Sequence, residues 1–418
     1  MEDAMKQGSD IIAGFVEGMD VSGYGIARSL GRKGVPVFAL NDQIPGWVRF
    51  SGYYNHCYIF QDDPTQPRTY RGGAVPNEDA ICKLLLEWRR DFQSSPVLFC
   101  GSDWFSRLLS YRQQDLCSRF LYHWIPIELF NKINNKWKMT EFCERAGVCV
   151  PPSHFIQPED DIEQVAKDFS YPCLVKPLHR HIEGFQVEGK VFIAQTAESL
   201  KVFFETYPKL RGATLIQELI EGGDDQIFQC TALVKRSGEV GALSVVRKLQ
   251  QYPPGYGMMC RGRTETNKEL ASEAIKLLDA LGYRGLGSME FKYRKQDGRY
   301  YFIEMNTRLP WYNGIFADAG INLAYLAYLD LTGQSDGSMS QPNQRNNVTW
   351  ISLRNYSKWY METQGKNPVA LWRWLASVVR ADSYAWWNWK DPLPFIASLA
   401  NYFGIIWRKT LKAFCFGK

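Results

Sequence analysis

The sequence predicts an α/β N-terminal domain, an α+β central domain and a helical C-terminal extension. Strands alternate with amphipathic helices up to about residue 130, and two-residue alternation with hairpin turns dominates from there to about residue 335. The last quarter holds aromatic-rich helical stripes. We therefore expect domains at 1–130, 131–335 and 336–418, with a smaller subdomain at about 153–215 inside the second. A chain of 418 residues has room for two or three such units.

The N-terminal region opens with a strand, a helix and a second strand. The apolar stretch 11–16 predicts the first strand, the amphipathic pattern over 24–33 predicts a helix, and 35–40 predicts the next strand. Alternation continues through the apolar segment 95–100. This order predicts a parallel, doubly wound sheet.

The first loop invites a dinucleotide interpretation. Gly23 and Gly25 have the spacing of a dinucleotide-binding loop, but Arg28 occupies the third glycine position. A tight turn that needs small residues is the favoured interpretation, and an oxidoreductase that uses this domain stays a lesser alternative.

The central region predicts strands and helices in α+β order. A helix near its start ends at Gly147, a polar loop follows Lys176, and the segment KRSGEV reads as a hairpin turn. The remaining predicted elements are a helix at 197–205, a strand at 213–222 and a helix at 268–281.

Two glutamates occupy successive strands of a predicted hairpin, GSMEFKYRKQDGRYYFIEMNTR (287–308). A two-residue loop, Asp297-Gly298, would put Glu290 and Glu304 on opposite faces of the hairpin, because strand side chains alternate. A three-residue loop at 296–298, with Gly298 in the left-handed conformation, would set Glu290 directly opposite Glu304. We favour the three-residue loop.

Carboxylates that face each other destabilise a sheet unless a cation lies between them. Glu290, Glu304 and Asn306 form an all-oxygen set that suits Mg²⁺ holding phosphate oxygens, with Mn²⁺ as an alternative. Arg308 follows two residues later and is a candidate cation for an oxyanion. The sequence therefore predicts a magnesium site on this hairpin.

Composition excludes some function classes. A formal net charge of +5, without a block of consecutive Lys or Arg, argues against nucleic acid as a partner. Ten cysteines lie scattered without a C-x-x-C pair, which predicts free thiols in a reducing compartment. The first apolar run is too short for a signal peptide, and no run reaches the length of a membrane span. We expect a soluble, cytoplasmic protein.

The segment FIEMNTR resembles the ATP-grasp ligases, whose last strand carries a magnesium-binding glutamate and asparagine. The resemblance covers about residues 131–333 and implies a two-subdomain ATP-grasp fold behind a Rossmann-like pre-ATP-grasp domain. By this resemblance, Lys136 and Lys176 reach the phosphates of ATP. The residues that it implies for the adenine and ribose are Gln217, Glu218, Ile220 and Asp225.

Two departures from the family pattern bear on the activity. The glycine-rich phosphate loop of many members is replaced by PLHRHIEGFQVEG (177–189), where His179, Arg180 or His181 could substitute for backbone donors. Biotin carboxylases share FIEMNTR but continue with a further glutamate and a histidine, whereas this chain continues LPWYNGIF. Carboxylation is therefore disfavoured.

Further segments resemble a bacterial subgroup of carboxylate–amine ligases, which extends the similarity over nearly the whole chain. These segments are VVRKLQQYPPGYGMMCRGRTE, LGYRGLGSMEFK and WKDPLPF. The implied reaction phosphorylates a carboxylate with ATP, and an amine then attacks the acyl phosphate to give an amide, ADP and phosphate. Arg308, Lys248 and Arg261 are the expected catalytic residues, and Arg247 and Arg263 are further candidates to hold an acidic substrate.

A catalytically silent ATP-binding scaffold is the competing hypothesis, which the unusual loop would permit. The C-terminal stretch 394–414 combines aromatic and apolar residues with Arg408, Lys409 and Lys412, so we also weigh a helix on the inner membrane surface against packing on a core. A homodimer is compatible with the sequence.

Overall fold

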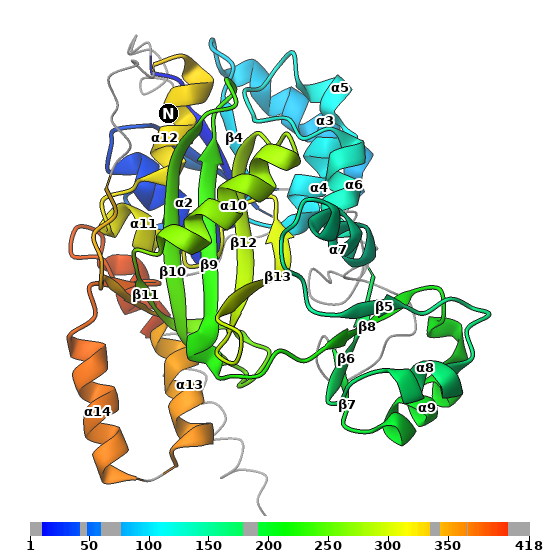
Figure 1. The fold of residues 1–418 in the computed structure, drawn as a ribbon. Helices are drawn as coiled ribbons and strands as arrows, with labels where there is room; N and C mark the ends of the chain where they lie inside the picture. Colours follow the sequence, from blue (N-terminus) through cyan, green and yellow to red (C-terminus); the bar gives the residue numbers. More distant parts are fainter. Residues whose placement is uncertain are drawn as a thin grey trace, which may run out of the picture. The chain divides into compact units, whose positions relative to one another are not determined.

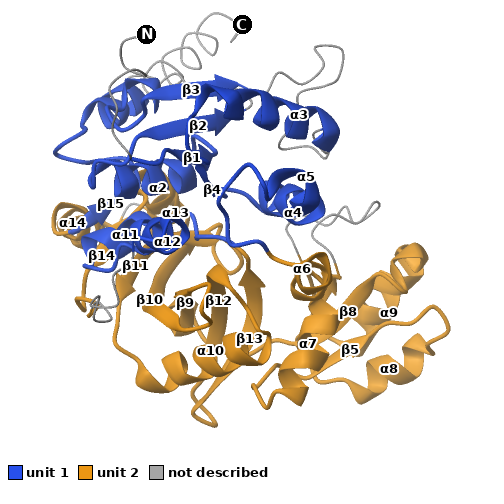
Figure 2. Cartoon of the chain, turned by 90° about the horizontal axis from the view of Figure 1, so that it is seen from above, with its two compact units in different colours: residues 1–124, 308–342, 381–418 blue, residues 125–307, 343–380 orange. Residues whose placement is uncertain are grey.

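The computed structural model describes residues 11–41, 48–59, 77–178, 191–334, 343–365 and 367–399. The chain divides into two compact units, which Figure 2 colours separately. Unit 1 contains 1–124, 308–342 and 381–418, and unit 2 contains 125–307 and 343–380. None of the helices in the described ranges has the length and apolar character needed to cross a bilayer.

Unit 1 is built on a parallel sheet with the strand order β3-β2-β1-β4 (Figure 1). The fold class expected from the alternation of strands and helices is confirmed. Its core holds buried apolar side chains from the strands and from α3 and α4. The elements are β1 (Gly14–Glu17), α2 (Val21–Gly31), β2 (Val37–Asn41), β3 (His56–Ile59), α3 (Glu78–Trp88), β4 (Val97–Phe99), α4 (Asp103–Tyr111), α5 (Gln113–Leu116), α11 (Gly314–Asp318), α12 (Leu323–Thr332) and β15 (Ser383–Tyr384).

The glycines of the first helix serve packing. A Cβ atom on Gly23 would lie 1.6 Å from the carbonyl oxygen of Gly18, and one on Gly25 would lie 2.3 Å from Oδ1 of Asn313. Arg28, only 2% exposed, donates to the carbonyl of Tyr384 at 3.2 Å. Close contacts within the protein therefore account for the small residues that resemble a dinucleotide-binding loop.

The motif WKDPLPF is anchored by a buried aspartate within unit 1. Asp391 is 5% exposed and accepts hydrogen bonds from Tyr24 Oη at 3.0 Å, Ser51 Oγ at 2.6 Å and the backbone N–H of Gly52 at 3.1 Å. These three bonds tie the C-terminal segment to α2 and to the segment after β2.

Unit 2 contains an antiparallel sheet with the order β13-β12-β9-β10-β11-β14. One face of this sheet forms a core with α10 and with α6 and α7. The bounds are α6 (Ile127–Asn134), α7 (Lys136–Arg145), β9 (Ile227–Val234), β10 (Val240–Tyr252), β11 (Met258–Thr264), α10 (Lys268–Ala280), β12 (Gly285–Arg294), β13 (Arg299–Asn306) and β14 (Thr349–Ile351).

The smaller sheet of unit 2 has the order β5-β8-β6-β7 and carries two helices of its own (Figure 1). Buried residues of α8 and α9 pack with its strands in a separate core. We call this part the lid. Its elements are β5 (Ser153–Phe155), α8 (Ile162–Asp168), β6 (Cys173–Pro177), β7 (Phe192–Ala194), α9 (Ala197–Thr206) and β8 (Thr214–Glu218).

Two further helices, α13 (Leu353–Thr363) and α14 (Pro368–Val379), follow β14. They form a hairpin that extends past the ends of β10 and β11 (Figure 1). Only α13 contacts the sheet substantially, through β10 and β11. The nine cysteines in the described ranges are free thiols, as their spacing predicted.

Candidate active site

The face of the large sheet opposite its core is polar. Glu304 pairs with Glu290, and Glu290 in turn pairs with Gln229, so their side chains form a row across β13, β12 and β9. The neighbouring residues Met289 and Phe291 point to the other face, where both are buried in the core. Strand alternation thus separates a polar surface from an apolar one.

Glu290 faces Glu304 as predicted, but the prediction of a three-residue loop between the two strands is wrong. Arg294 pairs with Arg299, so the loop has four residues, 295–298, and Gly298 has a φ of +70°. This register alone would misalign the glutamates by one residue. A β-bulge corrects it, because Phe291 pairs with Phe302 while Glu290 pairs with Glu304, and Ile303 is the extra residue.

Glu290 is surrounded by donors. Its Oε2 atom accepts from Gln229 Nε2 at 2.5 Å and from Lys248 Nζ at 3.2 Å. Lys248, from β10, is only 4% exposed. Asn306 Nδ2 lies 3.4 Å from Glu304 Oε1, which keeps the amide on the same face. Sequence reasoning missed Gln229, although a polar residue inside the apolar strand IFQCTALV was an available signal.

Two lysines lie together beside this face. Lys136 begins α7 and donates from Nζ to the carbonyl of Pro177 at 2.8 Å, next to Lys176 on β6. Burial, assisted by the charge of Lys136, lowers the pKa of Lys176 from 10.5 to about 8. Glu304 and Glu290 act in the opposite sense on this pKa. Lys176 therefore lies within electrostatic reach of Lys136 and of both glutamates.

Gln217 holds Lys176 in place. Its Oε1 accepts from Lys176 Nζ at 2.5 Å, and its Nε2 donates to Ser153 Oγ at 2.9 Å. Glu218, the next residue, points to the other side of β8, because strand neighbours alternate, and pairs with Arg294 at 3.1 Å. Ile220 is 5% exposed. Gln217 therefore joins the lysines through its side chain, and Glu218 does not.

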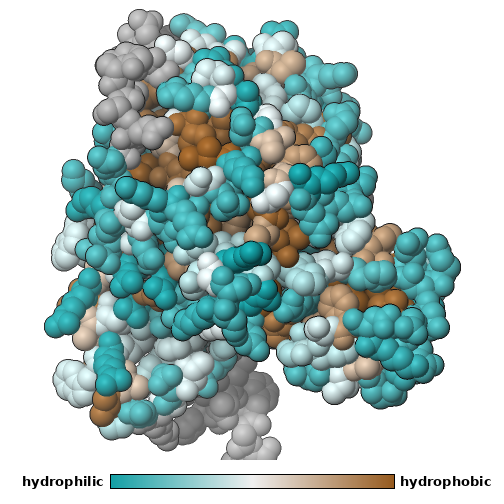
Figure 3. Space-filling view, in the orientation of Figure 1, coloured by the Kyte–Doolittle hydropathy of each residue, from teal (hydrophilic) through white to brown (hydrophobic). Residues whose placement is uncertain are grey.

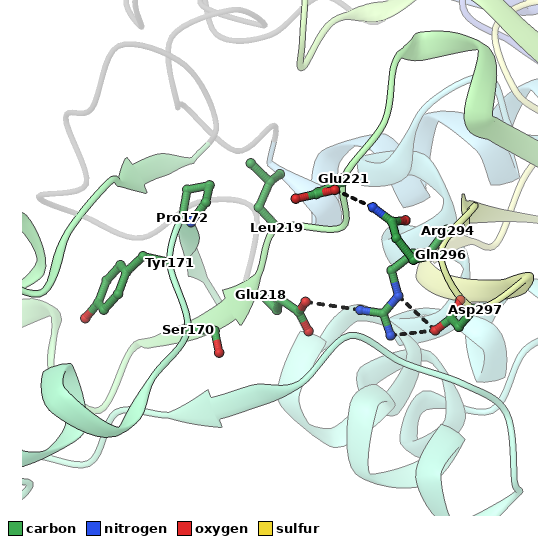
Figure 4. Close-up of a pocket in the computed structure, with 9 residues that line it drawn as sticks. All are labelled: Ser170, Tyr171, Pro172, Glu218, Leu219, Glu221, Arg294, Gln296 and Asp297. Carbon is green, nitrogen blue, oxygen red and sulfur yellow. Dashed lines mark hydrogen bonds and ion pairs between the residues drawn. The ribbon is translucent and has the colours of Figure 1, made fainter.

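Glu218 also lines a pocket of about 330 Å³, together with residues of the β12–β13 hairpin (Figure 4). Arg294 bonds both Glu218 and Asp297 there, and Gln296 donates to Glu221. These contacts join the β12–β13 hairpin to the segment that connects the lid to β9. Lys292 adds two bonds, to the carbonyls of residues 222 and 223 at 2.7 and 2.8 Å.

The donor set fits one hard divalent cation. Two carboxylates and one amide oxygen lie on one face, which matches the preference of Mg²⁺ for a few protein oxygens completed by water and phosphate. No group of three His, Cys, Asp or Glu side chains suited to a metal occurs in the part of the chain that the structure describes. A metal at Glu290 and Glu304 therefore depends on further ligands.

The four basic residues expected around an acidic substrate do not gather. Lys248 reaches Glu290, whereas Arg247 pairs with Arg263 across β10 and β11 and lies over the ring of Phe228, on the core side of the sheet. Arg261 lies against Gln250 and the ring of Tyr356.

Asp225, expected at the ribose, forms an ion pair with Arg247 at 3.2 Å. Arg308 belongs to unit 1, where its Nε donates to Asp103 Oδ1 at 2.6 Å. The loop with His179, Arg180 and His181 lies outside the described residues.

Comparisons with known proteins agree with the fold. Residues 263–328 match the family model "Carbamoyl-phosphate synthase L chain, ATP binding domain". D-aspartate ligase of Enterococcus faecium is 24% identical over 323 residues, which is 73% of each chain. Biotin carboxylase 1 of Bacillus subtilis is 26% identical over 198 residues, 44% of this chain and 42% of that protein.

Solved structures share the architecture. The biotin carboxylase domain of Hydrogenobacter thermophilus 2-oxoglutarate carboxylase, described as a dimer with MgADP, ADP and bicarbonate, has a TM-score of 0.60 at 17% identity, over 82% of this chain and 74% of that chain. N5-carboxyaminoimidazole synthetase of Staphylococcus aureus has a TM-score of 0.61 at 13% identity, over 86% and 88%. The matched segment holds Glu290, Glu304 and Asn306, and the chain resembles ATP-dependent ligases of the ATP-grasp fold in both sequence and architecture.

Proposed function

We propose that this protein uses ATP to join a carboxylate to an amine through an acyl phosphate, releasing ADP and phosphate. The observation that carries the proposal is the pairing of Glu290 with Glu304 on a polar sheet face within electrostatic reach of Lys176, beside which Lys136 is bonded. Opposed carboxylates beside two lysines suit a metal-bound polyphosphate, which brings matching negative charge.

The chemistry has two steps. A carboxylate oxygen attacks the γ-phosphorus of ATP, the bond from that phosphorus to the β–γ bridging oxygen breaks, and ADP leaves. The amine nitrogen then attacks the acyl carbon, the carbon–oxygen bond to phosphate breaks, and the nitrogen loses a proton. Lys136 and Lys176 stabilise the phosphate charge in the first step as point charges at strand and helix ends.

Glu290, Glu304 and Asn306 would hold Mg²⁺, or Mn²⁺ in its place. The ion would supply charge neutralisation on the β- and γ-phosphates. Lys248 and Gln229 orient Glu290, since each donates to the same carboxylate oxygen. In the nucleotide site, Gln217 acts through its side chain, and Glu218 and Ile220 contribute backbone at the adenine. Asp225 is assigned to the ribose, after exchange of its pairing with Arg247.

We assign the carboxylate substrate to small acidic molecules, with an amino acid as the first class to test. The D-aspartate ligase relative, named for an acidic amino acid, supports this choice. Among the basic residues expected at the substrate, Lys248 reaches Glu290, while the roles of Arg261 and Arg308 there stay predictions. A small-molecule amine is the second substrate.

The test is release of ADP and phosphate from purified protein with Mg²⁺ and ATP, against a panel of acidic amino acids, other small carboxylates and amines. We expect release that depends on both substrates and is lost in Glu304→Gln. Glu239→Gln, an exposed carboxylate in the β9–β10 turn, is the matched control and should keep full activity. AMP in place of ADP would refute the acyl-phosphate route.

Tight ATP binding without turnover on any pair would instead favour the silent scaffold. A homodimer and a cytoplasmic location remain predictions. So does contact of the C-terminal tail with the inner membrane surface, because its basic and apolar residues lie outside the described part of the chain.

A further inference from the structure

The helix α14 of the C-terminal hairpin has an apolar surface that nothing in the described structure covers. None of its residues is buried. Trp372 is 73% exposed, Val379 is 80% exposed and Val369 is 58% exposed. Exposed apolar residues scattered singly are ordinary in proteins, but several on one short helix indicate a contact surface.

One side of α14 already has a partner within the hairpin. The ring of Trp374 lies 5.7 Å from that of Tyr360 and 6.2 Å from that of Tyr356, and Ser377 Oγ lies 3.0 Å from Tyr356 Oη. This side packs on α13. Packing of α14 on α13 therefore does not account for the exposed apolar residues.

Most of the exposed apolar residues lie on the opposite side, and Val369 lies outside this group. Positions 368, 372, 375 and 379 follow a four-three-four spacing, which puts them on one face of a helix. These positions lie on the side of the helix opposite Trp374 and Ser377. We call this surface the α14 face, and its residues are Pro368, Leu371, Trp372, Leu375 and Val379.

Positive charge borders the α14 face. Arg373 and Arg380 are exposed and are separated by two helical turns, so they lie on one edge of the apolar stripe. The sequence from Gln364 to Ala381 contains no Asp or Glu. A stripe of Trp, Leu and Val bordered by basic and not by acidic residues suits a partner with a negatively charged outer layer and an apolar interior.

We propose that the α14 face docks the protein on anionic phospholipid. The apolar side chains enter the boundary between headgroups and acyl chains, Trp372 lies at the level of the headgroups, and the two arginines contact lipid phosphates. This surface differs from the C-terminal tail, and the ligase reaction does not require it. It would hold a soluble ATP-dependent enzyme near substrates that reside at a membrane.

The test uses the full chain and vesicles of phosphatidylcholine with or without phosphatidylglycerol, separated by sedimentation. We expect binding only to vesicles with phosphatidylglycerol, and weakening as salt rises. Trp372→Ser with Val379→Ser should lower the partition coefficient about tenfold or more, because burial of apolar area drives insertion. Arg373→Gln with Arg380→Gln should lower it on anionic vesicles.

The matched control is Val202→Ser with Ile275→Ser, two apolar residues that are 49% and 40% exposed on α9 and α10. It should bind like the unmodified protein. Equal binding of the Trp372/Val379 double variant and the unmodified protein would refute the proposal and assign any binding to another segment. Loss of self-association in that variant, with no lipid binding by the parent, would refute it in favour of a second copy.

Discussion

Lys176 should couple nucleotide binding to proton uptake. Burial, assisted by Lys136, lowers its pKa from 10.5 to about 8. This lowering of the pKa of Lys176 corresponds to about 3 kcal/mol against the charged form. We therefore compare ADP binding at different pH values, from below to above the pKa of Lys176.

The direction follows from the two protonation equilibria. Between pH 8 and pH 10.5 the unfolded chain keeps a proton on Lys176 that the folded protein has lost, so this group adds stability as pH rises through that range and costs stability below it. Phosphates beside Lys176 favour the ammonium and raise its pKa again. ADP should therefore bring a proton with it above pH 8.

At pH 8.5 about three quarters of the free protein would carry neutral Lys176, so we expect uptake of about 0.7 proton per ADP bound. The dissociation constant should rise by up to about tenfold per pH unit between pH 8 and the raised pKa of the complex. Isothermal titration calorimetry in two buffers of different ionisation enthalpy measures the uptake.

Lys268→Met, at an exposed lysine that begins α10, is the control and should show the same uptake as the unmodified protein. Lys176→Met should bind ADP more weakly and take up no proton at this pH. Measurable ADP binding without proton uptake at pH 8.5 would refute either the lowered pKa of Lys176 or its place beside the phosphates.

Three further predictions concern stability, each measured by urea unfolding. Glu290→Gln should destabilise unit 2 by about 3 kcal/mol, because it leaves the buried ammonium of Lys248 without its carboxylate; an unchanged midpoint would contradict the pairing. Asp391→Ala should cost about 3 kcal/mol, because it removes an acceptor of three hydrogen bonds; a loss below about 1 kcal/mol would mean that water replaces it. A double-mutant cycle on Arg294 and Glu218 should give a coupling of about 0.5 kcal/mol, since both side chains are about a quarter exposed, and high salt should reduce it.

The sequence could predict which face of a strand each residue occupies, because alternation is a local property. Glu304 and Asn306 were therefore placed on one face, whereas the pairing of Glu290 with Glu304 was reached through an expected three-residue loop and in fact depends on a four-residue loop and a bulge. The bulge at Ile303 could not be predicted, because it leaves no local pattern in the sequence, and the residue beside it bonds a distant part of the chain. The N–H of Phe302 turns away from β12 and donates to the carbonyl of Cys149 at 2.8 Å, a residue far back in the chain.

The ion-pair partners of charged side chains could not be predicted from the sequence either. Lys248 and Glu290 are 42 positions apart, and His123 and Asp330, buried within unit 1 at 2.7 Å, are 207 apart. Charge and spacing do not indicate which basic residue meets which acidic one over such separations. Arg28 is a different case. The sequence showed only that it replaces a glycine of the dinucleotide-binding motif, whereas in the structure it is buried and bonds the carbonyl of Tyr384.

The extra residue in β13 bears on how this hairpin tolerates changes of length. Phe302 and Glu304 are two positions apart but face opposite sides, because Ile303 interrupts the alternation. Deleting Ile303 would make them adjacent, and an uninterrupted strand would give each the side it has now. Deletion of another residue of β13 would leave the extra residue in place and shift the strand by one position, which would turn Glu304 or Phe302 to the wrong side. Among single deletions in β13, that of Ile303 should therefore be the one that magnesium binding survives.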